Sequence, residues 1–160
     1  EERRAAEHNA RPTLFIIRGA PGSGKTALAR TIAPAASFSA DDWFDLRAGE
    51  KDSTYLEVFD PADLDRAHGW CRDKVCENML ARLPRIAVAN TFVEAWMMEP
   101  YLELAGQHGY KASVILMQND FGNDHGVPEA KVKKMRRDLY RCPFIQTVVN
   151  GERLPITEQG

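Results

Sequence analysis

The sequence lacks any apolar run long enough to cross a membrane, since a spanning helix needs about 20 mostly apolar residues. Its first residues are polar and charged, so no secretory signal pattern is visible. It has only three cysteines, which cannot all pair and form no C-x-x-C spacing. Such sparse cysteine usage favours a reducing compartment and excludes a cysteine-based zinc site of the usual spacing. We therefore expect an intracellular protein with no membrane association.

What the chain does contain suits one domain of ordinary size. Its 160 residues are enough to bury a hydrophobic core, and 44% apolar with 28% charged residues is typical of globular proteins. The net charge of −2 by itself indicates neither a nucleic-acid nor a membrane partner. Because the first residue is not methionine, we expect the chain to be one domain of a larger protein.

The most informative segment fits G-x-x-x-x-G-K-[ST], the pattern of a phosphate-binding P-loop. It consists of Gly19, Ala20, Pro21, Gly22, Ser23, Gly24, Lys25 and Thr26. An apolar run precedes it and good helix formers follow it, so the required strand–loop–helix context is present. Lys25 would contact the β- and γ-phosphates, and the Thr26 hydroxyl would bind Mg²⁺. The segment predicts binding of ATP or GTP with Mg²⁺; the alternative is a glycine-rich turn without a ligand.

Apolar runs and helical periodicities alternate along the rest of the chain. Strands are expected at 13–18, 38–40, 85–90, 111–117 and 144–149. Helices are expected from the P-loop to Pro34 and at 62–83, 95–108 and 128–140, with an irregular segment at 47–61. This alternation predicts an α/β fold of the P-loop NTPase type, with a parallel central sheet and helices on both faces. The domain would span 13–150, between a polar lead-in at 1–12 and a tail at 151–160, and 118–127 would form a mobile lid loop.

In such a sheet, ligands bind beyond the carboxyl ends of the strands. That rule gathers the P-loop, Asp41, Asn90 and the loop after Met117 at one edge. A carboxylate at this edge can take the proton of an alcohol that attacks the γ-phosphate. Asp41 is the first candidate for this base and Asp42 the second; the alternative is that both cap the following helix. The short chain and the absence of an N-K-x-D guanine motif favour a phosphotransferase.

Further polar residues fall on or near the same edge. Asn90 and Thr91 end a predicted strand and could contact substrate or a metal-bound water. For His125, in the predicted lid, functional and structural roles stay open. For Trp96, packing in the core or at the rim is the expected role. Six bases lie between Pro128 and Cys142, against two acids: Lys131, Lys133, Lys134, Arg136, Arg137 and Arg141. They would attract nucleic acid, or they form a solvated helix face.

Several of these motifs, at their spacing, resemble the polynucleotide 5′-kinase family over roughly residues 13–141. They are the P-loop, Phe38-Ser39-Ala40-Asp41-Asp42-Trp43-Phe44, Ala67-His68, Asn90-Thr91-Phe92 with Trp96 and Pro100-Tyr101, and His125-Gly126-Val127-Pro128 with Met135. The resemblance implies a kinase that phosphorylates the 5′-hydroxyl of single-stranded RNA or DNA in repair or ligation. It also implies that Lys25 and the loop amides clamp phosphate, Thr26 binds Mg²⁺, Asp41 is the base and 118–127 is the lid.

The chain departs from the family pattern at three places. Ala89-Asn90 stands where members often carry aspartate, so a contact to magnesium or water is either missing or taken over by Asn90. Residues 121–123 stand where many members carry a lid arginine; either Arg136 or Arg137 replaces it, or turnover is weak. Trp43 and Phe44 replace an acceptor-binding arginine and either stack on a base or pack in the core. Two alternatives therefore stay open: a small-molecule P-loop kinase, and a nucleotide- or RNA-binding module with weak or no transfer.

Overall fold

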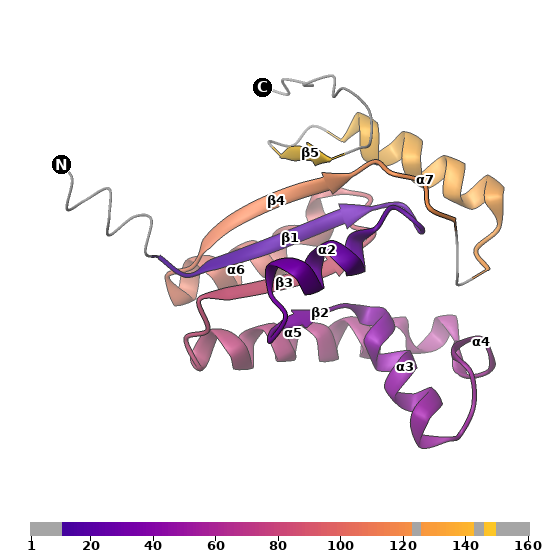
Figure 1. Ribbon diagram of the computed structural model, residues 1–160, viewed down its shortest axis with the longest axis horizontal. Coiled ribbons are helices and arrows are strands. Elements are labelled where there is room, and N and C mark those ends of the chain that lie inside the picture. The colour runs from indigo at the N-terminus through magenta and orange to yellow at the C-terminus, as the bar shows by residue number, and fades with distance from the viewer. Residues whose placement is uncertain (1–10, 123–125, 143–145, 150–160) are drawn as a thin grey trace.

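The expected parallel sheet forms around a central strand that leads into the P-loop. The computed structural model describes residues 11–122, 126–142 and 146–149. Its strands are β1 (Thr13–Gly19), β2 (Ser37–Phe38), β3 (Arg85–Asn90), β4 (Lys111–Met117) and β5 (Thr147–Val149). They lie in the order β2-β3-β1-β4-β5, and every neighbouring pair is parallel (Figure 1). All strands therefore end at one edge, and the P-loop leaves from the middle of it.

Helices cover both faces of this sheet. They are α2 (Lys25–Ile32), α3 (Ala40–Glu50), α4 (Tyr55–Val58), α5 (Leu64–Leu80), α6 (Glu99–His108) and α7 (Glu129–Arg141), with short 3₁₀ turns at Pro61–Asp63 and Ala95–Met98. Leu14 and Ile16 of β1 share a core with α5 and α6, whereas Ile17 packs with α2 on the other face (Figure 1). Because alternate residues of a strand face opposite layers, a strand covered on both faces is apolar along most of its length.

The extents expected for residues 38–83 are wrong in three respects. The second strand ends at Phe38, because Ser39 caps α3: its side chain accepts the Asp42 N–H, and the Asp42 carboxylate accepts the Ser39 N–H at 2.9 Å. Residues 47–61, expected to be irregular, contain the end of α3 and the whole of α4. The long helix is shorter than expected at both ends; it stops before Arg82, which takes a φ of 59°.

Elsewhere the local patterns located the elements well, except that the helix expected at 95–108 begins with the 3₁₀ turn Ala95–Met98 and becomes α6 only at Glu99. Strands β3 and β4 have the expected bounds, and α6 ends at Gly109 in a left-handed conformation, as predicted. The lead-in up to residue 10, the tail at 151–160 and part of the last predicted strand lie outside the described residues. Within residues 11–122, 126–142 and 146–149, none of the helices has the length and apolarity to cross a bilayer.

Candidate active site

The P-loop bends between β1 and α2 and is packed against the segment that follows β4. Gly22 and Gly24 have φ values of 80° and 90°, in the left-handed region that favours glycine. A Cβ on Gly22 would lie 1.7 Å from the Gly122 carbonyl oxygen, so a larger residue would push the two segments apart. The Phe121 N–H donates to the Gly22 carbonyl at 2.7 Å. Residues 118–122 of the predicted lid therefore lie directly on the phosphate loop; 123–125, with His125, are outside the described residues.

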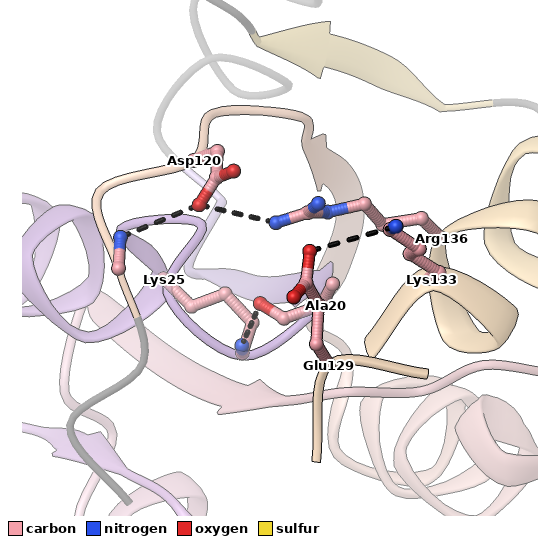
Figure 2. A network of polar contacts seen from close by, with 7 residues as sticks. Ala20, Lys25, Asp120, Glu129, Lys133 and Arg136 are labelled. Atoms are coloured by element: carbon pink, nitrogen blue, oxygen red, sulfur yellow. Dashed lines mark hydrogen bonds and ion pairs between the residues drawn. The ribbon is translucent and has the colours of Figure 1, made fainter. Parts of the chain in front are cut away.

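Lys25 opens α2 and reaches back into the loop. Its Nζ donates to the Ala20 carbonyl at 2.9 Å (Figure 2). Burial lowers the pKa of Lys25 to about 8, although the nearby negative charge of Asp41 raises it. Lys25 thus carries its charge inside the loop and close to Asp41, where it can contact terminal phosphates.

Asp41 lies in the first turn of α3 and receives a hydrogen bond that the sequence did not reveal. The Tyr55 hydroxyl of α4 donates to Asp41 Oδ1 at 2.7 Å. The Tyr55 ring is held by Phe44 and by Phe59, with ring centroids 5.8 and 5.6 Å away. Burial and the Asp41 charge raise the pKa of Tyr55, so its hydroxyl stays protonated as a donor. Phe44 is fully buried, so of the two alternatives for this aromatic residue the core role holds.

The other polar residues at this edge hold the start of α3 in place. Asp42 forms the helix cap together with Ser39, so its contacts are those of the capping role that was the alternative to a base. Burial raises the pKa of the Asp42 carboxyl group. Asn90 is buried; its Oδ1 accepts the Ala40 N–H at 2.9 Å, and its Nδ2 lies 3.9 Å from Cys71 Sγ. The Thr91 carbonyl accepts the Gly19 N–H at 3.2 Å. These contacts fix Asp41 relative to the P-loop, and substrate contacts by Asn90 and Thr91 stay predictions.

Of the two arginines expected to replace the lid arginine, only one points over the phosphate loop. Arg136 of α7 extends toward the P-loop, where its Nη2 lies 3.1 Å from Asp120 Oδ1 (Figure 2). The same carboxylate oxygen accepts the Gly122 N–H at 3.3 Å. The Arg136 side chain is 26% exposed, whereas Arg137 is exposed on the outer face of the helix. The geometry therefore favours Arg136 over Arg137 as the substitute for the lid arginine, and that role stays a prediction.

The residues present suit a magnesium ion that is held mainly by the nucleotide. In the part of the chain that the structure describes, no group of three or more histidine, cysteine or acidic side chains could hold a metal alone. Magnesium in P-loop kinases is held by few protein oxygens, with phosphates and water completing the shell. The exposed Thr26 hydroxyl in the first turn of α2 is such a ligand. Mg²⁺ binding itself remains a prediction.

Sequence reasoning missed Arg18, which fixes the scaffold beneath the loop. It is fully buried, and its guanidinium donates to the Phe92 carbonyl at 2.6 and 3.0 Å, to Val93 at 3.0 Å and to Gln146 at 3.0 Å. These acceptors compensate the cost of burying the charge. Its signal in the sequence was an arginine at a position where a buried strand should carry an apolar residue.

These features define the class of protein to which the chain belongs. A P-loop at the centre of a parallel α/β sheet, with a lysine inside the loop and a carboxylate nearby, is the arrangement of a P-loop kinase domain. More narrowly, the chain belongs to the AAA domain family (AAA_33), whose sequence model matches residues 14–121. Both findings confirm the fold class inferred from the sequence.

Three known proteins are similar to this chain. NEDD4-binding protein 2 of Homo sapiens is 31% identical over 153 aligned positions, and the match covers 86% of this chain and only 8% of that protein. A candidate kinase from Chloroflexus aurantiacus superposes with a TM-score of 0.62 at 13% identity, covering 87% of this chain and 86% of that one. A chain of the Pnkp1/Rnl/Hen1 complex superposes with a TM-score of 0.53 at 19% identity, covering 94% and 43%. At such identities the two solved structures show a shared fold.

Proposed function

We propose that this domain transfers the γ-phosphoryl group of ATP or GTP to the 5′-hydroxyl of a single-stranded nucleic acid, as a step of RNA repair or ligation. One observation carries the proposal. Asp41, its carboxylate oriented by Tyr55, lies near Lys25 at the edge where the P-loop binds phosphate. A base beside a phosphate clamp is what transfer to an alcohol requires.

In this mechanism the P-loop amides, the N-terminus of α2 and Lys25 bind the β- and γ-phosphates. Bound Mg²⁺ would neutralise developing charge on the phosphate oxygens. Asp41 accepts the proton of the 5′-hydroxyl while that oxygen attacks the γ-phosphorus. The bond from the γ-phosphorus to the bridging oxygen breaks, and the nucleoside diphosphate leaves. Arg136 turns from Asp120 toward the γ-phosphate and stabilises its charge.

The choice of a polynucleotide acceptor rests on three supports. The first is the family resemblance in motif spacing. The second is the row of bases on α7, which borders the P-loop and suits a phosphate backbone. The third is the shared fold with a chain of the Pnkp1/Rnl/Hen1 complex.

A panel of acceptors tests the proposal. Labelled ATP and GTP are offered with 5′-hydroxyl RNA and DNA oligonucleotides, and in parallel with sugars and nucleosides. Label is expected on the 5′ end of the oligonucleotides. Transfer confined to small molecules would establish the small-molecule kinase instead. Thermal stabilisation by nucleotide without any transfer would establish the binding module.

Tyr55→Phe is expected to slow transfer about tenfold, because it removes one hydrogen bond to a charged carboxylate and leaves the ring contacts. The Michaelis constant for NTP should change little, because the Tyr55 hydroxyl acts on the proposed base Asp41 and the substitution leaves Lys25 and the P-loop amides in place. Tyr110→Phe is the matched control: its hydroxyl donates to the Leu83 carbonyl at 2.7 Å, far from this edge. Steady-state kinetics measure the rate of transfer and the Michaelis constant of both variants. Equal effects of the two substitutions would refute a positioning role for Tyr55.

Nucleotide affinity is expected to fall as pH rises through about 8, the lowered pKa of Lys25. Below that pH the amine is a cation and attracts phosphate; above it the amine becomes neutral, and affinity should drop by up to about tenfold per pH unit. Titration with a non-hydrolysable NTP analogue between about pH 6.5 and 9.5 measures this. Lys25→Met should bind more weakly and show no break near pH 8. A wild-type profile that stays flat over this range would contradict the expectation.

A further inference from the structure

A hollow lies beside α7, on the side of the loop that follows β3. It is a cavity of about 400 Å³ between the loop after β3 and the C-terminal half of α7. Val93, Trp96, Asp138 and Arg141 are among its lining residues. Val93 also packs against the cluster that contains Ala20 of the P-loop. Through Val93 the cavity is therefore connected to the packing around the phosphate loop.

Trp96, for which packing was expected, is 60% exposed at this cavity. Its indole N–H donates to the Glu94 carboxylate, which fixes the orientation of the ring. The loop beneath it is held by the hydrogen bond from buried Arg18 to the Val93 carbonyl. A large aromatic ring held open to solvent on a fixed loop is suited to stack on a planar partner.

The opposite wall is formed by Asp138 and Arg141 of α7 and by Cys142, which follows it, and Arg141 is its base. Further bases continue from Arg141 along the helix, outside the cavity. Lys134, Arg137 and Arg141 are exposed on α7 and follow one another at three- and four-residue steps. Residues so spaced share one helix face, over about 10 Å of helix axis. Arg141, the last residue of this row, lines the cavity opposite the loop that carries Trp96. An aromatic platform beside a row of cations is how proteins bind single strands without regard to sequence.

We propose that this cavity holds a nucleotide of the acceptor strand downstream of its 5′ end, with its base stacked on Trp96 and a backbone phosphate at Arg141. The inference rests on the proposed function and adds a second contact with the acceptor, remote from Asp41. It follows that acceptors of several nucleotides bind through this cavity, whereas a single nucleotide engages only the site of transfer.

The test compares acceptors of two lengths, a nucleoside 3′-phosphate and a six-nucleotide 5′-hydroxyl strand, as RNA and as DNA. Trp96→Ala is expected to raise the Michaelis constant for the six-nucleotide strand about tenfold, the effect of one lost stacking contact. The constant for the nucleoside 3′-phosphate and kcat for both acceptors should stay unchanged. Trp96→Phe should retain most of the affinity, because it keeps an aromatic face.

Arg141→Ala should weaken binding of the longer strand and reduce its dependence on salt by about 0.7 in the double-logarithmic slope, the value for one phosphate contact on a single strand. Arg85→Ala is the matched control, since Arg85 is an exposed arginine at the start of β3, at the opposite edge of the sheet. Melting temperatures of all variants confirm that each one folds.

A loss of affinity that is confined to the six-nucleotide strand supports the inference. Unchanged affinity, or equal losses for both acceptor lengths, overturns it while leaving the kinase function in place. If the wild-type protein phosphorylates neither acceptor, the proposed function has failed, and fluorescence anisotropy of a labelled six-nucleotide strand then tests the cavity directly. Binding that Trp96→Ala and Arg141→Ala weaken still supports the cavity, and absence of binding overturns it.

Discussion

Asp41→Asn should reduce phosphoryl transfer by about 10²- to 10⁴-fold, the usual contribution of a general base. The substitution keeps the shape of the side chain, and its Oδ1 can still accept the Tyr55 hydroxyl hydrogen bond that Asp41 receives at 2.7 Å. What it removes is the ability to take the proton of the attacking hydroxyl. Single-turnover kinetics with labelled NTP and a 5′-hydroxyl oligonucleotide measure the effect.

Nucleotide binding by this variant should persist. Because the Asp41 charge raises the pKa of Lys25, Asp41→Asn should lower that pKa below its value of about 8. Affinity is therefore compared at about pH 6.5, below the wild-type pKa of about 8, where this shift has the least effect. A variant that binds NTP normally but does not transfer its phosphate would show that Asp41 acts as the base and is not needed to hold the phosphates.

Asp42→Asn is the control for this experiment. Asp42 contacts Ser39 in the helix cap, so its substitution should cost about 1 kcal/mol of stability and leave transfer intact. Retained transfer in Asp41→Asn would remove Asp41 as the base. Lost transfer in a folded Asp42→Asn would assign the base to Asp42.

Arg136→Ala should reduce kcat by about 10³-fold, as expected for an arginine that stabilises the transferring phosphate. The side chain already lies over the P-loop, with its guanidinium 3.1 Å from Asp120. A short rotation would carry it from this carboxylate to a γ-phosphate, whose greater charge competes for the same cation. The Michaelis constant for NTP should change much less than kcat, because this contact strengthens in the transition state.

Arg137→Ala provides the matched control for Arg136, since Arg137 is the next residue on the same helix but faces outward. With saturating acceptor, its loss should leave kcat nearly unchanged. Asp120→Ala, which frees Arg136 from its partner, should preserve or raise kcat. If Arg136→Ala and Arg137→Ala have equal effects, Arg136 contributes no more than general surface charge, and the lid arginine has no substitute on α7.

The sequence determined the P-loop, the parallel α/β class and the bounds of β3 and β4. Each of these depends on local information: glycines where the backbone needs positive φ, apolar runs where a strand is covered on both faces, and the Gly109 stop of α6. Even the Ser39–Asp42 cap, which displaced the expected strand end, is a local pattern that the sequence displays.

Only the tertiary structure decided how the site is assembled. Tyr55 reaches Asp41 because the turn between α3 and α4 brings them together, and Arg136 reaches the P-loop because α7 packs beside the end of β4. Arg18 is separated by 74 residues from Phe92, the residue whose carbonyl it binds. Periodicity and propensity describe neighbours along the chain, whereas these contacts join distant segments through packing. The sequence by itself therefore determined which reaction class to expect, and the fold decided which side chains can take part in it.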